Sequence, residues 1–228
     1  MIRVEGVSHV RGRTRVLQDI DLELPVATLA VLAGRSGSGK STLCHLIAGV
    51  MAPSQGRVLF RGRPLRGTPP WVDISLLPQR LALEPDLTVA ENVLLPIGLR
   101  KQRIDDRESG HRGAGLLERL GLAGIAGRRV RETSLGEQQR AALGRALVLG
   151  PAVAVLDEPT AHQDDDHVHL VLAALAAAVD DGTLVVVASH DQRVIETAGM
   201  VTRMRSGRID EAGGHERRGA DDAGDQKA

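Results

Sequence analysis

The chain has 228 residues and a formal net charge of zero at pH 7, so its length allows one large domain or two small ones, and its charge gives no general attraction for nucleic acid or an anionic membrane surface. Its single cysteine, Cys44, excludes an internal disulfide and suits a reducing compartment. The first residues have no signal-peptide pattern, and the longest apolar run, residues 170–179, is about half the length of a membrane span. We therefore expect a soluble protein.

The first third of the chain predicts a small antiparallel sheet. Residues 11–14 read as a hairpin turn between two segments that alternate apolar and polar side chains, as half-buried strands do. Short strands are predicted at four places, residues 4–7, 20–24, 57–60 and 74–77.

A glycine-rich loop lies between the apolar run of residues 28–33, a predicted strand, and residues 41–48, a predicted helix. It reads G-x-x-x-x-G-K-S, the phosphate-binding loop, whose backbone N–H groups point at phosphate oxygens. Lys40 can reach the terminal phosphates, and the Ser41 hydroxyl can ligate Mg²⁺. The flanking strand and helix disfavour the alternative, a glycine turn with a chance lysine. The binding candidates are Gly34, Arg35, Ser36, Gly37, Ser38, Gly39, Lys40, Ser41 and Thr42.

The middle of the chain predicts helices. Thr88 and Glu91 have capping-box spacing, so a helix begins there, and we expect Pro96 to end or kink it. A charged, helix-like stretch follows over residues 104–121. Ser134 and Glu137 repeat the capping-box spacing and predict a second capped helix, which runs to residue 149 before Gly-Pro stops it.

The last third predicts buried strands that alternate with helices, and then a hairpin. Strands are expected over residues 153–156 and 184–188, a helix over 170–179, and a hairpin over 200–209. Residues 211–228 lack apolar periodicity and are expected to form a disordered tail.

Polar residues that could take part in catalysis or metal binding follow three predicted buried strands. Asp157 and Glu158 come directly after one strand, His190 follows the next, and Gln79 ends an earlier one. The carboxyl ends of parallel strands meet at one edge of a sheet, which is where α/β ligand sites form. Asp157 can hold Mg²⁺, Glu158 can orient or deprotonate a water, and His190 can approach a γ-phosphate. A solvated acidic turn and a structural histidine are the alternatives.

These motifs together resemble the nucleotide-binding subunit of ATP-binding-cassette (ABC) transporters. The resemblance covers about residues 1–210 and rests on their order along the chain. That order is the phosphate loop, Gln79, Ser134-Leu135-Gly136-Glu137-Gln138-Gln139-Arg140, Leu156-Asp157-Glu158-Pro159-Thr160, Asp164 and Ser189-His190-Asp191. It implies an α/β fold with a P-loop NTPase core, a mostly parallel sheet, an N-terminal antiparallel β subdomain and a helical subdomain at about residues 80–150.

The resemblance also implies a role for each matching residue. In the family, two subunits pack head to tail, and each ATP lies between the phosphate loop of one and the signature helix of the other. Gln79 is then the glutamine that senses Mg²⁺ and the permease, Glu158 the catalytic base and His190 the switch histidine. Asp164 links the two sites, while the signature residues that face the partner's ATP are Ser134, Gly136 and Glu137. ATP and Mg²⁺ are the implied ligands, with Ser41, Gln79 and Asp157 at the metal.

The chain departs from the family pattern in three places. Leu135 replaces the first glycine that usually follows the signature serine, which crowds the approach to the partner's phosphate. No aromatic lies near the first turn to stack on adenine; Arg11 can stack its guanidinium instead or face solvent, and Val16 is the other binding candidate there. The acidic run at residues 164–166 is unusual, and we expect only the first aspartate to be functional.

The implied partners are membrane permease subunits and a second ATPase subunit, for which we expect a homodimer while a heterodimer stays open. No nucleic acid is expected, and the protein would lie in the cytoplasm at the inner face of the plasma membrane. Residues 87–96 look like the permease-facing region of the lipoprotein-release and macrolide-export branch. The alternatives are a non-transport ABC-type ATPase, which usually carries inserted coiled coils, an ATP-binding module with weak hydrolysis, or a translation-associated member, which needs two cassettes.

Overall fold

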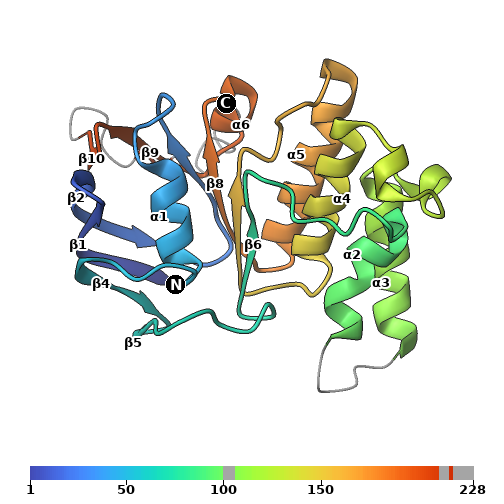
Figure 1. The fold of residues 1–228 in the computed structure, drawn as a ribbon, viewed down its shortest axis with the longest axis horizontal. Helices are drawn as coiled ribbons and strands as arrows, with labels where there is room; N and C mark the ends of the chain where they lie inside the picture. The colour runs from blue at the N-terminus through green and yellow to red at the C-terminus, as the bar shows by residue number, and fades with distance from the viewer. Residues whose placement is uncertain (100–105, 211–215, 218–228) are drawn as a thin grey trace, which may run out of the picture.

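The structure, a computed structural model, describes residues 1–99, 106–210 and 216–217. These residues form two sheets with helices packed between and beside them (Figure 1). The architecture confirms the expected α/β fold, with an antiparallel sheet at the N-terminus, a mostly parallel central sheet and a group of helices at one side.

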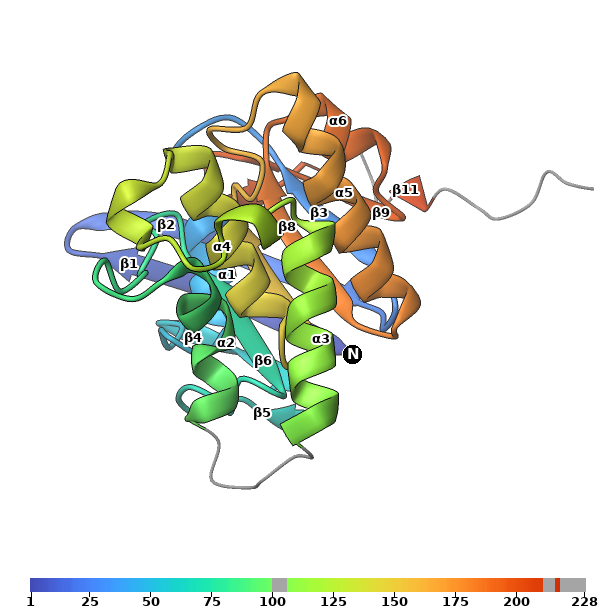
Figure 2. The same ribbon diagram turned by 90° about the vertical axis from the view of Figure 1, so that its right-hand side faces the viewer.

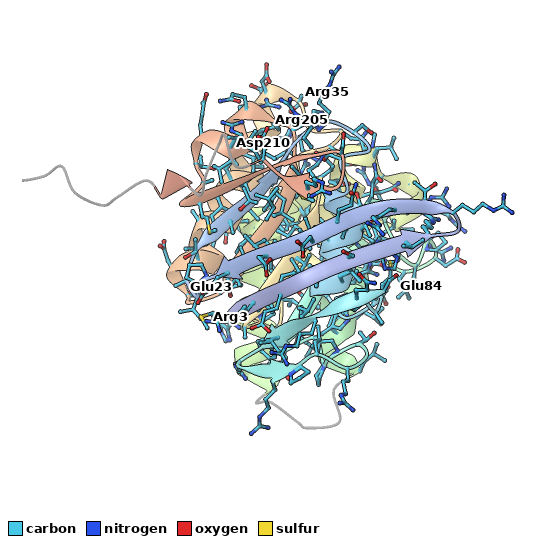
Figure 3. All side chains as sticks on the ribbon, turned by 90° about the vertical axis from the view of Figure 1, so that its left-hand side faces the viewer. Arg3, Glu23, Arg35, Glu84, Arg205 and Asp210 are labelled. Atoms are coloured by element: carbon cyan, nitrogen blue, oxygen red, sulfur yellow. The ribbon has the colours of Figure 1, made fainter. Side chains whose placement is uncertain are left out.

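The antiparallel sheet has the strand order β2-β1-β4-β5. Its long hairpin pairs β1 (Ile2–Arg11) with β2 (Thr14–Leu24), and the turn falls at Gly12 and Arg13, as the sequence predicts. β4 (Gln55–Phe60) and the two-residue β5 (Arg63–Pro64) complete it. Figure 3 shows the outer face of this sheet, where Arg3 on β1 lies beside Glu23 on β2 at 3.2 Å.

The central sheet has the order β10-β9-β3-β8-β7-β6, and its neighbouring strands from β9 to β6 are parallel. Both faces of the sheet are covered, which explains why its strands are continuous apolar runs. The parallel strands are β3 (Leu29–Ala33), β6 (Ile74–Leu77), β7 (Val153–Asp157), β8 (Leu184–Ser189) and β9 (Met200–Arg205). Their carboxyl ends meet at one edge of the sheet.

Helices cover the two faces of the central sheet unequally. On one face, α1 (Lys40–Ile47) lies between the two sheets, and Leu43 and Ile47 pack into a core shared with the antiparallel sheet (Figure 1). The other face packs on α5 (Asp165–Asp180) and on the helical group seen in Figure 2. That group comprises α2 (Val89–Gly98), α3 (Asp106–Arg119) and α4 (Leu135–Leu147).

Both predicted capping boxes are present. At α2, the Thr88 hydroxyl accepts from the Glu91 N–H at 3.2 Å, and the Glu91 carboxylate accepts from the Thr88 N–H at 2.8 Å. At α4, Ser134 and Glu137 make the same reciprocal pair at 3.2 and 2.7 Å. Each box satisfies N–H groups that a helix start leaves without a partner.

Several element ends differ from the prediction. Pro96 does not end α2, which continues to Gly98, because a buried proline in the last turn leaves only the Asn92 carbonyl without its helical partner. α4 ends at Leu147, two residues early, where the Gly150 N–H bonds to the Leu147 carbonyl at 2.9 Å. α5 starts five residues before the predicted helix, and α6 (Gln192–Glu196) was not predicted at all.

The C-terminal hairpin is confirmed: β9 turns at Ser206 and Gly207 into β10 (Arg208–Ile209). In the expected disordered tail, Glu216–Arg217 form the short strand β11, which pairs with β9. The rest of the tail lies outside the described residues. Within the part of the chain that the structure describes, no helix has the length and apolar character needed to cross a membrane.

Candidate active site

The phosphate-binding loop is held between the two sheets by close backbone packing. A side chain at Gly39, where φ is 104°, would meet the Leu17 side chain at 2.7 Å and the Val16 carbonyl at 3.2 Å. A side chain at Gly34 would meet the Met204 carbonyl at 2.4 Å. Glycine is therefore required at both positions, because the loop touches β2 on one side and β9 on the other.

Lys40 lies at the centre of this loop and is only 6% exposed. Its ammonium group donates to the Gly34 carbonyl at 2.7 Å and to the Arg35 carbonyl at 3.2 Å. A lysine ammonium has three donors, so one remains for a phosphate oxygen at the mouth of the loop. The local backbone thus holds a buried positive charge where a nucleotide's phosphates would bind.

Asp157 ends β7 and is 2% exposed. Burial raises the pKa of its carboxyl, the neighbouring Ser41 hydroxyl opposes that rise, and the Glu158 charge adds to it. Neither carboxylate oxygen has a hydrogen-bond partner in the described structure. A buried carboxylate with unpaired oxygens is costly unless a cation joins it, and oxygen ligands of this kind suit Mg²⁺.

Glu158 follows directly, in a strained backbone conformation with φ of 52°. Its N–H bonds to the Ala188 carbonyl at 2.9 Å, and its carbonyl accepts from the Gln139 side chain at 3.1 Å. Two backbone contacts from different elements therefore fix a conformation that a glutamate rarely adopts. Such strain is typical of functional positions, where the surrounding structure holds it in place.

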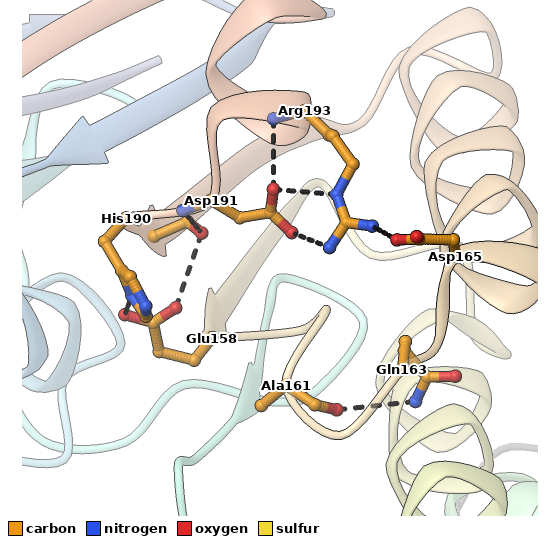
Figure 4. Close-up of polar contacts among 8 residues, drawn as sticks. Glu158, Ala161, Gln163, Asp165, His190, Asp191 and Arg193 are labelled. Carbon is orange, nitrogen blue, oxygen red and sulfur yellow. Dashed lines mark hydrogen bonds and ion pairs between the residues drawn. The ribbon is translucent and has the colours of Figure 1, made fainter.

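The Glu158 carboxylate faces the end of β8 (Figure 4). One oxygen lies 2.9 Å from Nδ1 of His190, and the other accepts from the Ser189 hydroxyl at 3.4 Å. The His190 side chain is 76% exposed, whereas that of Glu158 is 17% exposed. The glutamate is thus partly sheltered, and the imidazole stands at the mouth of the site with its other nitrogen open to a ligand.

Lys40, Glu158 and His190 line one cleft of about 940 Å³, whereas Asp157 is buried and is not among the lining residues. Most of the predicted site residues contribute to it: Val16, Arg35, Ser36, Gly37, Gly39, Lys40, Ser41, Thr42, Gln79, Glu158 and His190. Gly34 and Ser38 form the inner side of the loop instead, and Arg11 is exposed on the hairpin turn outside the lining. None of the described residues that line the cleft is Phe, Tyr or Trp, so the only rings there are the imidazoles of His162 and His190.

Sequence reasoning missed six residues that also line the cleft, namely Gln139, Thr160, Ala161, His162, Asp191 and Arg193. Asp191 directly follows His190, and three of the others follow Glu158 within four residues, so proximity to a motif could have found them. Gln139 is one turn into α4, on its buried side. Nothing in the sequence marks Arg193.

The signature residues lie at the start of α4 and do not line this cleft. Ser134 and Leu135 are exposed, Leu135 by 57%. The Gly136 carbonyl accepts from the Gln163 side chain at 2.9 Å, and a side chain at Gly136 would meet the His162 carbonyl at 2.8 Å. The Glu137 carboxylate is occupied in the capping box.

Asp164 is the N-cap of α5. Its carboxylate accepts from the His167 N–H at 2.9 Å and also contacts the His167 ring. The contact with the His167 side chain lowers the pKa of the Asp164 carboxyl. The first aspartate of the acidic run therefore has a helix-capping role within the chain, and Asp165 and Asp166 lie in the first turn.

Comparison with known proteins gives a consistent family. Residues 17–161 match the family model described as ABC transporter. The glutamate transport ATP-binding protein GluA of Corynebacterium glutamicum is 36% identical, over 84% of this chain and 81% of that protein. The lipoprotein-releasing system ATP-binding protein LolD of Aquifex aeolicus is 31% identical, over 92% and 96%.

Comparison of the fold with solved structures indicates the same family. The ATP-binding cassette MJ0796, in a dimeric post-hydrolysis state bound to ADP and Pi, matches with a TM-score of 0.85 at 26% identity, covering 96% of this chain and all of that one. The chain belongs to the ABC transporter family, and it is an ATP-hydrolysing ATP-binding cassette.

Proposed function

We propose that this cassette drives a separate membrane permease, and that ATP closes two cassettes head to tail to do so. One observation carries the proposal: the groups needed to handle ATP are divided between two places. Lys40 and Glu158 line the cleft, whereas Ser134 stands exposed at the start of α4, outside it. A second cassette that brings its own Ser134 to the cleft would complete the site.

Mg²⁺ fits the cleft beside the phosphates. The unpaired oxygens of Asp157 and the hydroxyl of Ser41 are hard oxygen ligands, and the Gln79 side chain lines the same cleft. The ion would supply charge neutralisation between the β- and γ-phosphates. Lys40 and the loop N–H groups would hold the same oxygens from the other side.

Glu158 is placed to act as the general base for hydrolysis. Its carboxylate accepts a water proton, and its hydrogen bond to His190 fixes the carboxylate's orientation. With a proton on both ring nitrogens, His190 would donate from Nδ1 to Glu158 and from Nε2 to the γ-phosphate. The strained backbone at Glu158 holds this geometry before ATP arrives.

The start of α4 has the physical properties of a phosphate ligand for the partner's ATP. The Ser134 oxygen accepts the capping bond, so its O–H proton is free to be donated. The helix dipole adds positive potential at the same point. Gly136 has no side chain to obstruct the partner's phosphate, whereas the exposed Leu135 side chain lies in its path. Hydrolysis would remove the shared γ-phosphate, and the dimer would reopen.

Gln79, Asp164 and the exposed end of α2 are the contacts that we assign to coupling. Gln79 lines the cleft and begins the loop that leads to α2. Leu99, at the end of α2, is 73% exposed and suits a permease contact. The cassette would then work in the cytoplasm at the inner membrane face, bound through its permease.

We further propose the export or lipoprotein-release type for that permease. The capped helix at residues 88–98 and the similarity to LolD support it. The glutamate transport relative supports a solute-transporting permease instead. Crosslinking from a Leu99→Cys variant in native membranes discriminates between them, since Cys44 is buried and does not compete. A captured permease with a solute channel would contradict the release type.

The Glu158→Gln variant tests the mechanism. We expect it to bind ATP, to lose turnover and to accumulate as an ATP-bound dimer on size exclusion, while Glu118→Gln, an exposed change on α3, behaves as wild type. Wild-type turnover should rise more steeply than linearly with protein concentration. Turnover by Glu158→Gln at the wild-type rate would disprove the base assignment, and a strictly linear dependence would disprove closure as a dimer.

Two alternatives are addressed by the turnover assay and the crosslinking experiment. An ATP-binding module with weak hydrolysis would show low turnover at every concentration, and the exposed Leu135 is the observation that favours it. A non-transport ATPase would turn over ATP but would capture no permease in the crosslinking experiment. The described residues between the phosphate loop and α4 form short elements and contain no long helix, which argues against that class.

A further inference from the structure

Arg193 lies in the first turn of α6, at the rim of the cleft, and joins two elements (Figure 4). Its Nε and Nη2 atoms each lie 3.0 Å from one oxygen of Asp191, a two-pronged ion pair. Its Nη1 atom lies 2.6 Å from the carboxylate of Asp165, at the start of α5. One guanidinium therefore bridges the turn after β8 and the loop after β7.

The Asp191 end of this bridge is tied to the catalytic groups. The Asp191 N–H donates to the Ser189 hydroxyl at 3.0 Å, and that hydroxyl donates to Glu158 at 3.4 Å. His190 lies between them in sequence and contacts the other Glu158 oxygen. The position of Asp191 thus sets the position of both groups that we assign to hydrolysis.

The Asp165 end is tied to the signature helix. Two residues before Asp165, the Gln163 side chain donates to the Gly136 carbonyl at 2.9 Å and accepts from Arg140 at 2.6 Å. The loop from Glu158 to Asp165 therefore lies between α4 and Arg193. A displacement of the start of α4 would move this loop and, through it, the Asp165 carboxylate.

We propose that Arg193 is a positioning residue for ATP hydrolysis, which holds the Glu158 and His190 pair in place by clamping the Asp191 turn to the Asp165 loop. This inference rests on the proposed role of Glu158 as the base. The clamp would also carry a movement of the signature helix to the hydrolytic groups of the same chain. Arg193 is not offered as a phosphate ligand.

The charges support positioning over phosphate binding. Two carboxylates already face the single guanidinium, and three of its nitrogens are engaged. Little positive potential is left to attract a nucleotide. The Arg193 contact also lowers the pKa of Asp191, which keeps that carboxylate ionised and paired across the neutral range.

Asp165 and Asp191 differ in how exposed they are, so loss of each ion pair with Arg193 should have a different effect on stability. The Asp165 side chain is 98% exposed, whereas that of Asp191 is 15% exposed. An exposed ion pair contributes little to the free energy of unfolding. Loss of the Asp165 contact should therefore change the rate of hydrolysis and leave the melting temperature unchanged, which a merely structural ion pair would not do.

Steady-state ATP turnover of Arg193→Gln, Asp165→Asn and Asp166→Asn tests the inference. Asp166 is the matched control, because it is the next acid in the same turn and forms no ion pair with Arg193 in the described structure. We expect Arg193→Gln to lower kcat about tenfold with KM for ATP unchanged, because misplacement of a catalytic group costs rate and not binding. Asp165→Asn should give a smaller loss of kcat, and Asp166→Asn none.

A double-mutant cycle sharpens the result. If Asp165 acts only through Arg193, adding Asp165→Asn to Arg193→Gln causes no further loss. Arg193→Lys should restore part of kcat, because a lysine keeps the charge but not the two-pronged geometry. If Arg193→Gln fails to fold, Asp165→Asn alone carries the test.

Three outcomes would overturn the inference. A raised KM with unchanged kcat in Arg193→Gln would make Arg193 a nucleotide ligand. Wild-type kinetics in both Arg193→Gln and Asp165→Asn would show that the clamp has no role in hydrolysis. Additive losses of kcat in the double variant would show that Arg193 and Asp165 act independently. Turnover by Glu158→Gln would instead disprove the proposed function, so the two failures are distinguishable.

Discussion

The cleft and the start of α4 differ in how complete they are within one chain. In the cleft, functional side chains already have partners from the same chain, such as Lys40 on the loop carbonyls and Glu158 on His190. At the start of α4, Ser134 and Leu135 are exposed. The cleft is preorganised to bind a ligand, whereas the start of α4 presents exposed groups to a partner outside the chain.

The physical reason for the difference lies in what each region must hold. The cleft keeps Lys40 buried on the carbonyl groups of its own loop, because a buried charge needs partners within the fold. The start of a helix needs only a cap, which leaves its dipole and one hydroxyl proton free. A surface of that kind is stable alone and still competent to bind an anion.

Replacement of Lys40, the lysine in the cleft, should have the largest effect of the changes considered, because it removes ATP binding by the cleft. We expect Lys40→Ala to abolish ATP binding, because it removes the ammonium group from the centre of the loop. Saturating ATP should then no longer raise the melting temperature, whereas at 100 times Kd it stabilises the wild type by about 2.7 kcal/mol. Arg63→Ala, an exposed change on β5, is the control. An ATP-dependent shift in Lys40→Ala would contradict the placement of the phosphates.

Loss of the signature cap should reduce turnover without affecting binding by the single chain. Ser134→Ala removes a cap worth about 1 kcal/mol and also the hydroxyl offered to the partner's phosphate. Thr88→Ala removes the matching cap at α2 and nothing from the proposed interface. We expect turnover to fall on the order of 100-fold in Ser134→Ala only. Equal losses in the two variants would reduce Ser134 to a structural cap.

Leu135→Gly should move activity and stability in opposite directions. It clears the approach to the start of α4, so we expect a few-fold rise in turnover and in ATP-dependent dimer. It also places glycine in the first turn, which should lower the free energy of unfolding by roughly 0.5–1 kcal/mol. Leu135→Ala also removes the bulky side chain but does not add the backbone freedom of glycine, so it separates the two effects. Lower turnover in both variants would show that Leu135 contributes to the interface instead of crowding it.

The smallest expected effect concerns Asp157, whose pKa is raised above 3.8 by burial. A raised carboxyl pKa means that ionisation opposes folding; the cost is absent at pH values below 3.8, grows as pH rises from 3.8 to the folded-state pKa, and is constant above it. Asp157→Asn should therefore raise the melting temperature of the protein without nucleotide at pH 7. It should also weaken the further stabilisation by ATP with Mg²⁺. Asp166→Asn is the exposed control, and a lower melting temperature in Asp157→Asn would contradict the reasoning.

Much of this protein could be predicted from the sequence because its signals are local. The capping boxes at Thr88 and Ser134 each involve side chains and N–H groups three residues apart. Apolar runs mark the buried parallel strands, and the glycine loop marks the phosphate site through backbone conformation. Interactions over such short separations form in the same way wherever the segment lies in the fold.

Element ends were predicted less well, because tertiary packing decides them. A buried Pro96 is accommodated within α2, and Asp164 starts α5 before the apolar pattern begins. The five-residue helix α6 is too short to show a period. Packing free energy outweighs the weak local preferences at these positions.

The sequence by itself determined which groups are present: the phosphate loop, the acidic pair after β7, the histidine after β8 and the capped signature helix. Only the tertiary structure decided which of them meet. Glu158 and His190 are 32 residues apart, and they touch because β7 and β8 are neighbours in register. The same pairing lets Arg193, which follows β8, reach Asp165, which follows β7. Contacts of this kind depend on strand order, which no local pattern encodes.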